Sequence, residues 1–411
     1  MNIDARTVFA SNLSTAILGF GIFIATYDIA AISISIVVLG KLWHITKFLE
    51  GLLGTATLIG AALGAISGGF LADLIGRRGM LVYDFIGYFL ASMLSALSIN
   101  YWMLFIFRFI IGLTIGADYA IAFPYISEMR PKNKMNKDMA MVMFAANFGM
   151  VIAYGAGGMF LGLGNYGWRY VLALGGILAI PAIILRYKIV ESPLWSQRRL
   201  KKSIFRHFSK NEKKSIAFSS AAWFAYQVGD QGLSIFLPTI MVFMLGVGFS
   251  LSSYYSLIVK AVTIPAALLT VYTIDKLGKK FLQTYGFLGR SIALLSLGFI
   301  IIYGFDIRYY GILLLLAAYF FGAAGPDKTV VISPVDSFRY EVRCTGEGLS
   351  ESFGRLGGIF GVLMFGFIAT YIGIGTGITV FGILDLFGFI ISAIFMSGTL
   401  KYKSYINNVK T

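Results

Sequence analysis

The chain has 411 residues, of which 58% are hydrophobic and 13% are charged, and its mean hydropathy is +0.80. About a quarter of the residues in a soluble domain are charged, so this composition excludes a soluble globular protein and indicates an integral membrane protein. The single cysteine, Cys344, excludes an internal disulfide. The two histidines, His44 and His207, are far apart in the sequence and offer little for a metal site. No Walker loop is present, so nothing suggests that ATP hydrolysis drives the protein. No nucleophile–base pair or metal cluster is apparent either, and we expect no enzyme activity, no cofactor and no metal.

The net charge of +15 does not indicate nucleic-acid binding, because the basic residues gather in alternate loops between apolar segments. The N-terminal stretch MNIDARTVFASN is polar and lacks the short apolar core of a signal peptide. We therefore expect the chain to start in the cytoplasm.

Apolar runs follow one another along the whole chain, and a run of roughly 20 residues can cross a membrane as a helix. In chain order we predict twelve crossings, at 13–39, 51–73, 80–99, 102–127, 139–163, 169–187, 215–245, 249–273, 282–303, 309–334, 346–370 and 376–399. An even number places both termini on one side. The loops on that side carry most of the lysines and arginines, which makes it the cytoplasmic side.

The longest hydrophilic loop, residues 191–214, follows the sixth predicted crossing and divides the chain in two. It predicts an N-terminal six-helix bundle over 1–190, a basic cytoplasmic linker over 191–214 and a C-terminal six-helix bundle over 215–411.

An internal repeat supports this division. GGFLADLIGRRG after the second crossing and YTIDKLGKK after the eighth share an acid, two residues, a glycine and two bases. Gly-Ala-Asp at 116–118 and Gly-Pro-Asp at 325–327 keep nearly the same offset. Parallel halves with a substrate site near the middle of the membrane are typical of transporters.

Several of these stretches are similar to signatures of the major facilitator superfamily. GGFLADLIGRRG resembles its loop between helices two and three, and DKLGKK resembles the second copy. Residues 108–131 and 333–361 resemble the fourth helix and the tenth-to-eleventh helix junction of phosphate:proton symporters, sugar porters and organic-ion transporters. ESPLW at 191–195 resembles a sugar-porter motif, whereas GADY at 116–119 resembles the phosphate symporters.

The resemblance implies an all-α membrane protein of twelve transmembrane helices, arranged as two pseudo-symmetric six-helix bundles with cytoplasmic termini. It also implies that helices one, four, seven and ten surround a central cavity.

Acidic residues near the middle of predicted crossings are candidates for function, because a charge there is costly. Asp28, Asp118, Asp230 and Asp327 qualify. A carboxylic acid in a dry cavity can hold a proton near neutral pH. We predict Asp118, and second Asp28, as proton-coupling residues; alternatively, Asp118 bonds to Tyr119 or pairs with Arg108 and only holds helices together.

Three bases at similar depth, Lys260, Lys328 and Arg355, are predicted to bind substrate. The planar fork of arginine suits a carboxylate or a phosphate. Alternatively, Arg355 pairs with Glu351, which lies four residues earlier on the same helix face. For Lys260 we expect a substrate contact or an aspartate partner.

Neutral and aromatic side chains complete the predicted substrate site. We expect Asp230 and Asp327 to take part, together with Tyr119, Asn147, Trp223, Tyr226, Gln227 and Gln231. The two glutamines resemble those that contact sugar in sugar porters, which keeps a sugar substrate open.

The charged residues of the repeated loops are predicted to form a gate that pairs when the cytoplasmic side is closed. These residues are Asp73, Arg77, Arg78, Asp275, Lys279 and Lys280, together with Glu128 and Arg343. Their alternative role is topology signalling and helix capping.

The sequence thus predicts a secondary transporter that works by alternating access, as a proton-coupled symporter of a small anion such as phosphate or an organic acid. A sugar porter is the alternative, and a non-transporting sensor of the same fold is a third reading. Its partners would be the small-molecule substrate, protons and lipid, without nucleic acid, and we expect a monomer in a prokaryotic cell membrane.

Overall fold

The computed structural model describes residues 5–196, 208–305, 307–335 and 337–396, and all regular elements in them are helices. This confirms the all-α prediction. A bilayer offers no water to unpaired backbone groups, so a spanning segment has to satisfy them within itself. In chain order the helices are α1 (Ala5–Leu42), α2 (Lys47–Ile75), α3 (Arg77–Ala96), α4 (Tyr101–Met129), α5 (Lys132–Phe160), the 3₁₀ helix η1 (Leu161–Tyr166), α6 (Gly167–Arg186), α7 (Pro193–Ser196), α8 (Lys210–Leu245), α9 (Phe249–Ala261), α10 (Thr263–Ile302), α11 (Ile307–Ala324), α12 (Pro326–Val335), α13 (Arg343–Tyr371) and α14 (Ile374–Phe395).

Ten helical stretches among the described residues are long and apolar enough to cross a membrane. Two of them, Lys134–Arg186 and Ser250–Ile302, have 53 residues each, which is enough for two crossings. The first is interrupted by η1 and the second by Gly278, whose φ is 80°. The count of twelve crossings stays a prediction.

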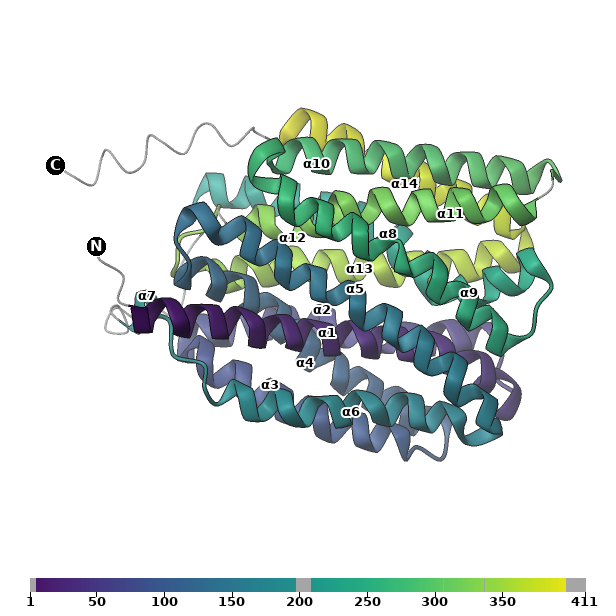
Figure 1. The fold of residues 1–411 in the computed structure, drawn as a ribbon, viewed down its shortest axis with the longest axis horizontal. Coiled ribbons are helices and arrows are strands. Elements are labelled where there is room, and N and C mark those ends of the chain that lie inside the picture. The colour runs from purple at the N-terminus through teal and green to yellow at the C-terminus, as the bar shows by residue number, and fades with distance from the viewer. Residues whose placement is uncertain (1–4, 197–207, 306, 336, 397–411) are drawn as a thin grey trace.

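The long helices lie side by side along the horizontal axis of Figure 1. We call α1–α6 the first half and α8–α14 the second half. The first half occupies the lower part of the view and the second half the upper part, and the main contacts between them join α2 to α13 and α5 to α9 and α10. The division into two bundles stays a prediction, and residues 197–207 of the predicted linker lie outside the described residues.

The glycine of the repeated loop motif interrupts a helix in both copies. Gly76 separates α2 from α3 with a φ of 121°, and Gly278 breaks α10 with a φ of 80°. A side chain disfavours positive φ, whereas glycine adopts it readily. The repeat is therefore one of backbone conformation as well as of sequence.

The predicted crossing 309–334 is interrupted between α11 and α12. Pro326 begins α12, because a proline ring fixes φ and provides no N–H for a continuing helix. The break places Asp327 in the first turn of α12, where the partial positive charge of a helix N-terminus favours an acid.

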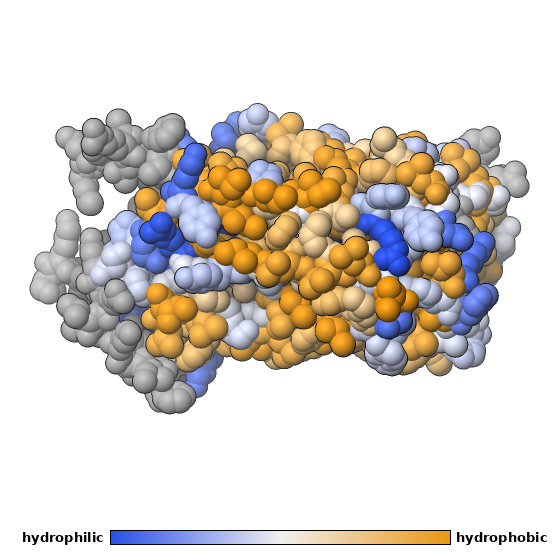
Figure 2. Space-filling view, turned by 90° about the horizontal axis from the view of Figure 1, so that it is seen from below, coloured by the Kyte–Doolittle hydropathy of each residue, from blue (hydrophilic) through white to orange (hydrophobic). Residues whose placement is uncertain are grey.

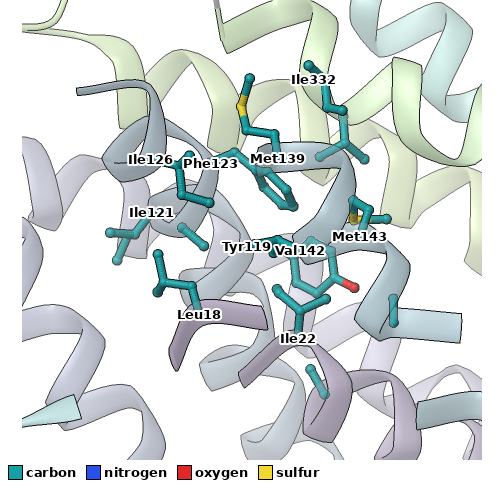
Figure 3. Packing of buried hydrophobic residues seen from close by; sticks show 14 of the residues in the cluster. Leu18, Ile22, Tyr119, Ile121, Phe123, Ile126, Met139, Val142, Met143 and Ile332 are labelled. Carbon is teal, nitrogen blue, oxygen red and sulfur yellow. The ribbon is translucent and has the colours of Figure 1, made fainter. Parts of the chain in front are cut away.

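Apolar residues cover the middle of the face shown in Figure 2, while hydrophilic residues gather toward the two ends of the molecule. Inside, a hydrophobic cluster joins the halves, because Ile332 of α12 packs among side chains of α1, α4 and α5 (Figure 3). The labelled first-half members are Leu18, Ile22, Tyr119, Ile121, Phe123, Ile126, Met139, Val142 and Met143.

Helices α2 and α4 approach closely through glycines. A Cβ on Gly64 would lie 2.0 Å from the carbonyl oxygen of Leu113, and a Cβ on Gly116 would lie 2.1 Å from that of Ala61. Gly60 and Gly64 of α2, and Gly112 and Gly116 of α4, are each four residues apart and lie against the other helix. Small residues at this spacing let membrane helices come into backbone contact. This contact fixes α4, which carries Asp118 and Tyr119, against α2.

We expect Gly116→Val to destabilise the protein, because its side chain would push α4 away from α2. Overpacking of this kind costs about 1–3 kcal/mol, so the thermal unfolding midpoint in detergent should fall. Gly162→Ala is the matched control, since a Cβ there meets no atom within 4 Å. Equal midpoints for both variants would show that the α2–α4 contact is not tight.

Candidate functional site

Residues of α1, α4 and α5 face residues of α8–α13 across a cavity between the halves. The cavity wall contains ten of the thirteen residues predicted for substrate binding or proton coupling. The ten are Tyr119, Asn147, Trp223, Tyr226, Gln227, Asp230, Gln231, Lys260, Asp327 and Arg355. Lys328 is fully buried and pairs with Asp327.

One face of α8 supplies much of the polar wall, because its residues recur at helical spacing. Gln231 Nε2 donates to Gln227 Oε1 at 3.3 Å, and Tyr226 Oη donates to Asp230 Oδ1 at 3.4 Å. Lys260 Nζ of α9 lies 3.9 Å from Asp230 Oδ1. Asp230 is therefore the predicted aspartate partner of Lys260.

Arg355 contacts groups from both halves. Its Nε and Nη2 donate to Glu351 Oε1 at 3.1 and 2.9 Å, as the four-residue spacing predicts. Its guanidinium also lies over the ring of Tyr119, 4.8 Å from the centroid. Arg355 therefore belongs both to an ion pair and to the cavity wall.

Arg290 of α10 is a wall residue that the sequence analysis missed. Only 1% of it is exposed, its Nε lies 3.3 Å from Asp385 Oδ2 of α14, and its guanidinium lies over the ring of Tyr226. Among the described residues, Nη1 and Nη2 have no hydrogen-bond partner. Lys260 and Arg355 were predicted to bind substrate because they lie near the middle of predicted crossings. Arg290 lies near the middle of the predicted crossing 282–303, so the same argument could have identified it.

The two predicted coupling acids lie in the first half, outside the cavity wall. Arg108 binds Asp28, with 2.6 Å from Nη1 to Oδ2 and 2.7 Å from Nη2 to the Asp28 carbonyl oxygen. The alternative role predicted for Asp118 was a pair with Arg108, and this pair is not formed. The partner of Asp118 is Arg186 of α6, with 2.6 Å between Oδ1 and Nη2.

Asp118 shares Arg186 with a second acid, Asp84. Arg186 Nη1 also donates to Asp84 Oδ1 of α3 at 3.2 Å, and all three side chains are buried. Asp84 and Arg186 lie near the ends of the predicted crossings 80–99 and 169–187. Depth in the membrane therefore does not identify them as candidates from the sequence.

The first copy of the loop motif contacts the second half at the end of the bundle where α1 begins (Figure 1). Asp73 accepts from Thr345 through its backbone N–H at 2.8 Å and its hydroxyl at 2.7 Å, and pairs with Arg77 at 2.9 Å. Arg77 Nη2 donates to Glu128 and to the carbonyl oxygen of Tyr340.

Two other predicted gate residues bind nearby. Arg343 Nη1 of α13 donates to Ser127 of α4 at 3.1 Å, 4.0 Å from Glu128. Arg78 stays within the first half, where its Nη2 donates to the carbonyl oxygen of Tyr187 at 3.2 Å.

The second motif copy is arranged differently. Asp275 is exposed and Lys280 half-buried, while buried Lys279 donates to the carbonyl oxygen of Ile332 at 3.3 Å. The two copies therefore share backbone geometry but not their contacts.

The halves also meet at the opposite end of the bundle. Tyr154 Oη of α5 donates to the carbonyl oxygen of Ser234 at 2.7 Å, and Ser250 of α9 donates to that of Gly158 at 3.1 Å. A charged cavity between two halves that touch at both ends defines a membrane transport protein.

The sequence matches the model of the Major Facilitator Superfamily over residues 18–335, so the chain belongs to that family. It is 24% identical over 371 residues to the putative niacin/nicotinamide transporter NiaP of Bacillus subtilis, covering 86% of this chain and 87% of that protein. It is 25% identical over 393 residues to the cis,cis-muconate transport protein of Acinetobacter baylyi, covering 92% and 91%.

Among solved structures, the xylose transporter XylE from E. coli, in a partially occluded inward open conformation, has the same fold. The TM-score is 0.80 at 21% identity, covering 95% of this chain and 98% of that one. The chain is thus a transporter of metabolites and not an enzyme.

Asp28→Asn should destabilise the protein, because it strands the buried charge of Arg108. Breaking a buried pair costs about 3–5 kcal/mol, and Asp28→Asn with Arg108→Gln should recover part of it. The measurement is thermal unfolding in detergent, with exposed Asp275→Asn as the control. An unchanged midpoint in Asp28→Asn would show that the pair does not hold α1 to α4.

Proposed function

We propose that this protein is a proton-coupled symporter of a small anion, and that the anion is an organic acid. The observation that carries this proposal is the presence of three cationic side chains, Lys260, Arg290 and Arg355, in one buried cavity wall. A neutral substrate has little need of three cations. Arg290, with two unpartnered donor nitrogens, offers the fork that binds a carboxylate or a phosphate.

The name of one relative agrees with an organic acid, since it is named for cis,cis-muconate. Another is named for niacin, which is an acid, and for nicotinamide, which is its neutral amide. The wall also contains rings that suit a planar organic body, from Tyr119, Trp223, Tyr226 and Tyr319. Phosphate would use the cations but not these rings.

Asp118 remains our proposed coupling residue, with Asp28 second. Asp84 and Asp118 share one arginine in a dry interior, and two carboxylates with one cation favour a proton on one of them. Arg108 balances the charge of Asp28 alone, so this pair favours a proton less than the two acids around Arg186 do. The coupling proton would reside on the pair of acids around Arg186.

Transport would proceed by alternating access between the two halves, which we propose are six-helix bundles. In this structure the two halves are in contact at both ends. We propose that the end where α1 begins faces the cytoplasm, as the basic loops indicate. Asp73, Arg77, Glu128 and Arg343 would then form the inner gate, in a prokaryotic cell membrane.

A sugar substrate is the second candidate. Gln227 and Gln231 lie one turn apart in the cavity wall beside Trp223, and Asn147 faces them from the first half. These side chains can bind hydroxyl groups, as a sugar porter would require. In that case the cations would serve only as partners of the cavity acids.

Uptake into proteoliposomes under an inward proton gradient distinguishes the candidates. We expect accumulation of labelled niacin or muconate, but not of xylose or arabinose. Phosphate uptake would keep the anion proposal and remove its organic part. Uptake of sugar alone would overturn the anion proposal.

Asp118→Asn should abolish proton-driven accumulation while keeping exchange of internal for external substrate, because a fixed amide mimics the protonated acid but cannot release a proton. Asp138→Asn is the control, since Asp138 belongs to an ion pair with Arg130 outside the cavity wall. Undiminished uphill uptake in Asp118→Asn would exclude Asp118 from coupling.

Asp73→Asn should slow transport without weakening substrate binding, because it removes charge from the contact with Thr345. Its repeat counterpart, Asp275→Asn, should have a smaller effect, since Asp275 is exposed. The rates come from initial uptake and the affinities from equilibrium binding. A loss of affinity in folded Asp73→Asn would contradict the gate role.

A further inference from the structure

The ion pair of Arg290 and Asp385 joins α10 to α14 at a rigid contact. Ser291 Oγ donates to the carbonyl oxygen of Gly382 at 2.7 Å, and Gln283 Nε2 donates to Ser392 Oγ at 2.9 Å. These two bonds lie on either side of the pair along the helix interface. The position of Arg290 is therefore fixed by packing.

The pair leaves polar atoms without partners. Arg290 Nε is 3.3 Å from Asp385 Oδ2, but Nη1 and Nη2 and both Asp385 oxygens have no hydrogen bond to the described residues. Arg290 lies in the cavity wall, whereas Asp385 is fully buried outside it. Most buried donors in proteins are hydrogen-bonded, so unpartnered guanidinium nitrogens at a cavity wall can bind an anion without first giving up another hydrogen bond.

The first half contains a similar pair with the charges exchanged. There α3, directly after its motif glycine, carries Asp84, and α6, the last long helix of that half, carries Arg186. In the second half α10, after its motif glycine, carries Arg290, and α14 carries Asp385.

The two arginines differ in how many carboxylates they bind. Arg186 has two, from Asp84 and Asp118, while among the described residues Arg290 has that of Asp385 alone. Asp327, the repeat counterpart of Asp118, pairs with Lys328 instead. Arg290, unlike Arg186, therefore presents guanidinium nitrogens to the cavity wall.

The charges around Arg290 are already matched. Each cation of the second-half site has one acid, in the pairs Lys260–Asp230, Arg290–Asp385, Lys328–Asp327 and Arg355–Glu351. The charged and titratable groups nearest to Arg290 and Asp385 are Asp230, Tyr226 and Tyr319, with Lys260 next to Asp230. An entering anion would therefore add an unmatched negative charge to a dry site.

We propose that Arg290 binds the carboxylate of the substrate through Nη1 and Nη2, and that Asp385 takes up one proton when it does. The carboxylate enters as an anion, the proton adds to a carboxyl oxygen of Asp385, and Arg290 stays charged. No covalent bond other than this O–H forms, and the net charge of the site does not change. This inference rests on the proposed organic-acid function and adds a second proton site to it.

Equilibrium binding to the purified full chain in detergent, as a function of pH, tests the proposal. The probes are niacin and cis,cis-muconate, with nicotinamide as the neutral counterpart of niacin. Because one proton accompanies the anion, the Kd of the acids should rise about tenfold per pH unit above the titration of Asp385. Nicotinamide should bind at least tenfold more weakly and without this slope.

Asp385→Asn should abolish the slope and tighten acid binding at high pH, since Arg290 then has no competing carboxylate. Asp385→Glu should keep the slope, and Arg290→Gln should weaken acid binding about 100-fold. Asp138→Asn is the matched acid-to-amide control. Arg290→Gln with Asp385→Asn, which leaves no buried charge stranded, shows whether a loss of binding reflects misfolding.

The outcomes separate this inference from the proposed function. Acid binding that keeps its slope in Asp385→Asn and loses it in Asp118→Asn would overturn the inference and leave anion symport intact. Acid binding unaffected by Arg290→Gln would also overturn it. Binding of nicotinamide or xylose but of neither acid would overturn both.

Discussion

A charge buried in an apolar helix bundle needs an opposite charge beside it, because desolvation makes an isolated ion very costly. The interior follows this requirement: Arg108 meets Asp28, and Arg290 meets Asp385. Each pair joins two helices that are distant in sequence. The pairs therefore restrict which faces of α1 and α4, and of α10 and α14, can meet, and a change in one partner affects both helices.

The two halves use this constraint differently. In the first half the charges satisfy one another behind the cavity wall, with Arg186 between two acids. In the second half, cations with a single partner reach the wall itself. In our proposal the second half supplies the substrate contacts, while the first half adds a proton site and an aromatic surface. In this proposal, function thus arises from differences between the two halves.

The same asymmetry is present in the loops. Both motif copies place a glycine with positive φ after an acid, but only Asp73 reaches across to α13, while Asp275 is exposed. A repeated sequence conserves the backbone turn, because that depends on local geometry. The contact across the halves depends on the helix that lies opposite. The first motif copy faces α13, which offers Thr345, whereas α10, which carries the second copy, packs on α5.

From the sequence alone, hydropathy determined the membrane helices, and depth along them selected Asp230, Lys260 and Arg355 for the cavity. These properties are local, and helical spacing alone also predicted the Arg355–Glu351 pair. Only the tertiary structure decided that Asp118 meets Arg186 and that Arg290 reaches the wall. Such partners lie on different helices, and which helix faces meet depends on the packing of the whole bundle, including the glycine contacts between α2 and α4.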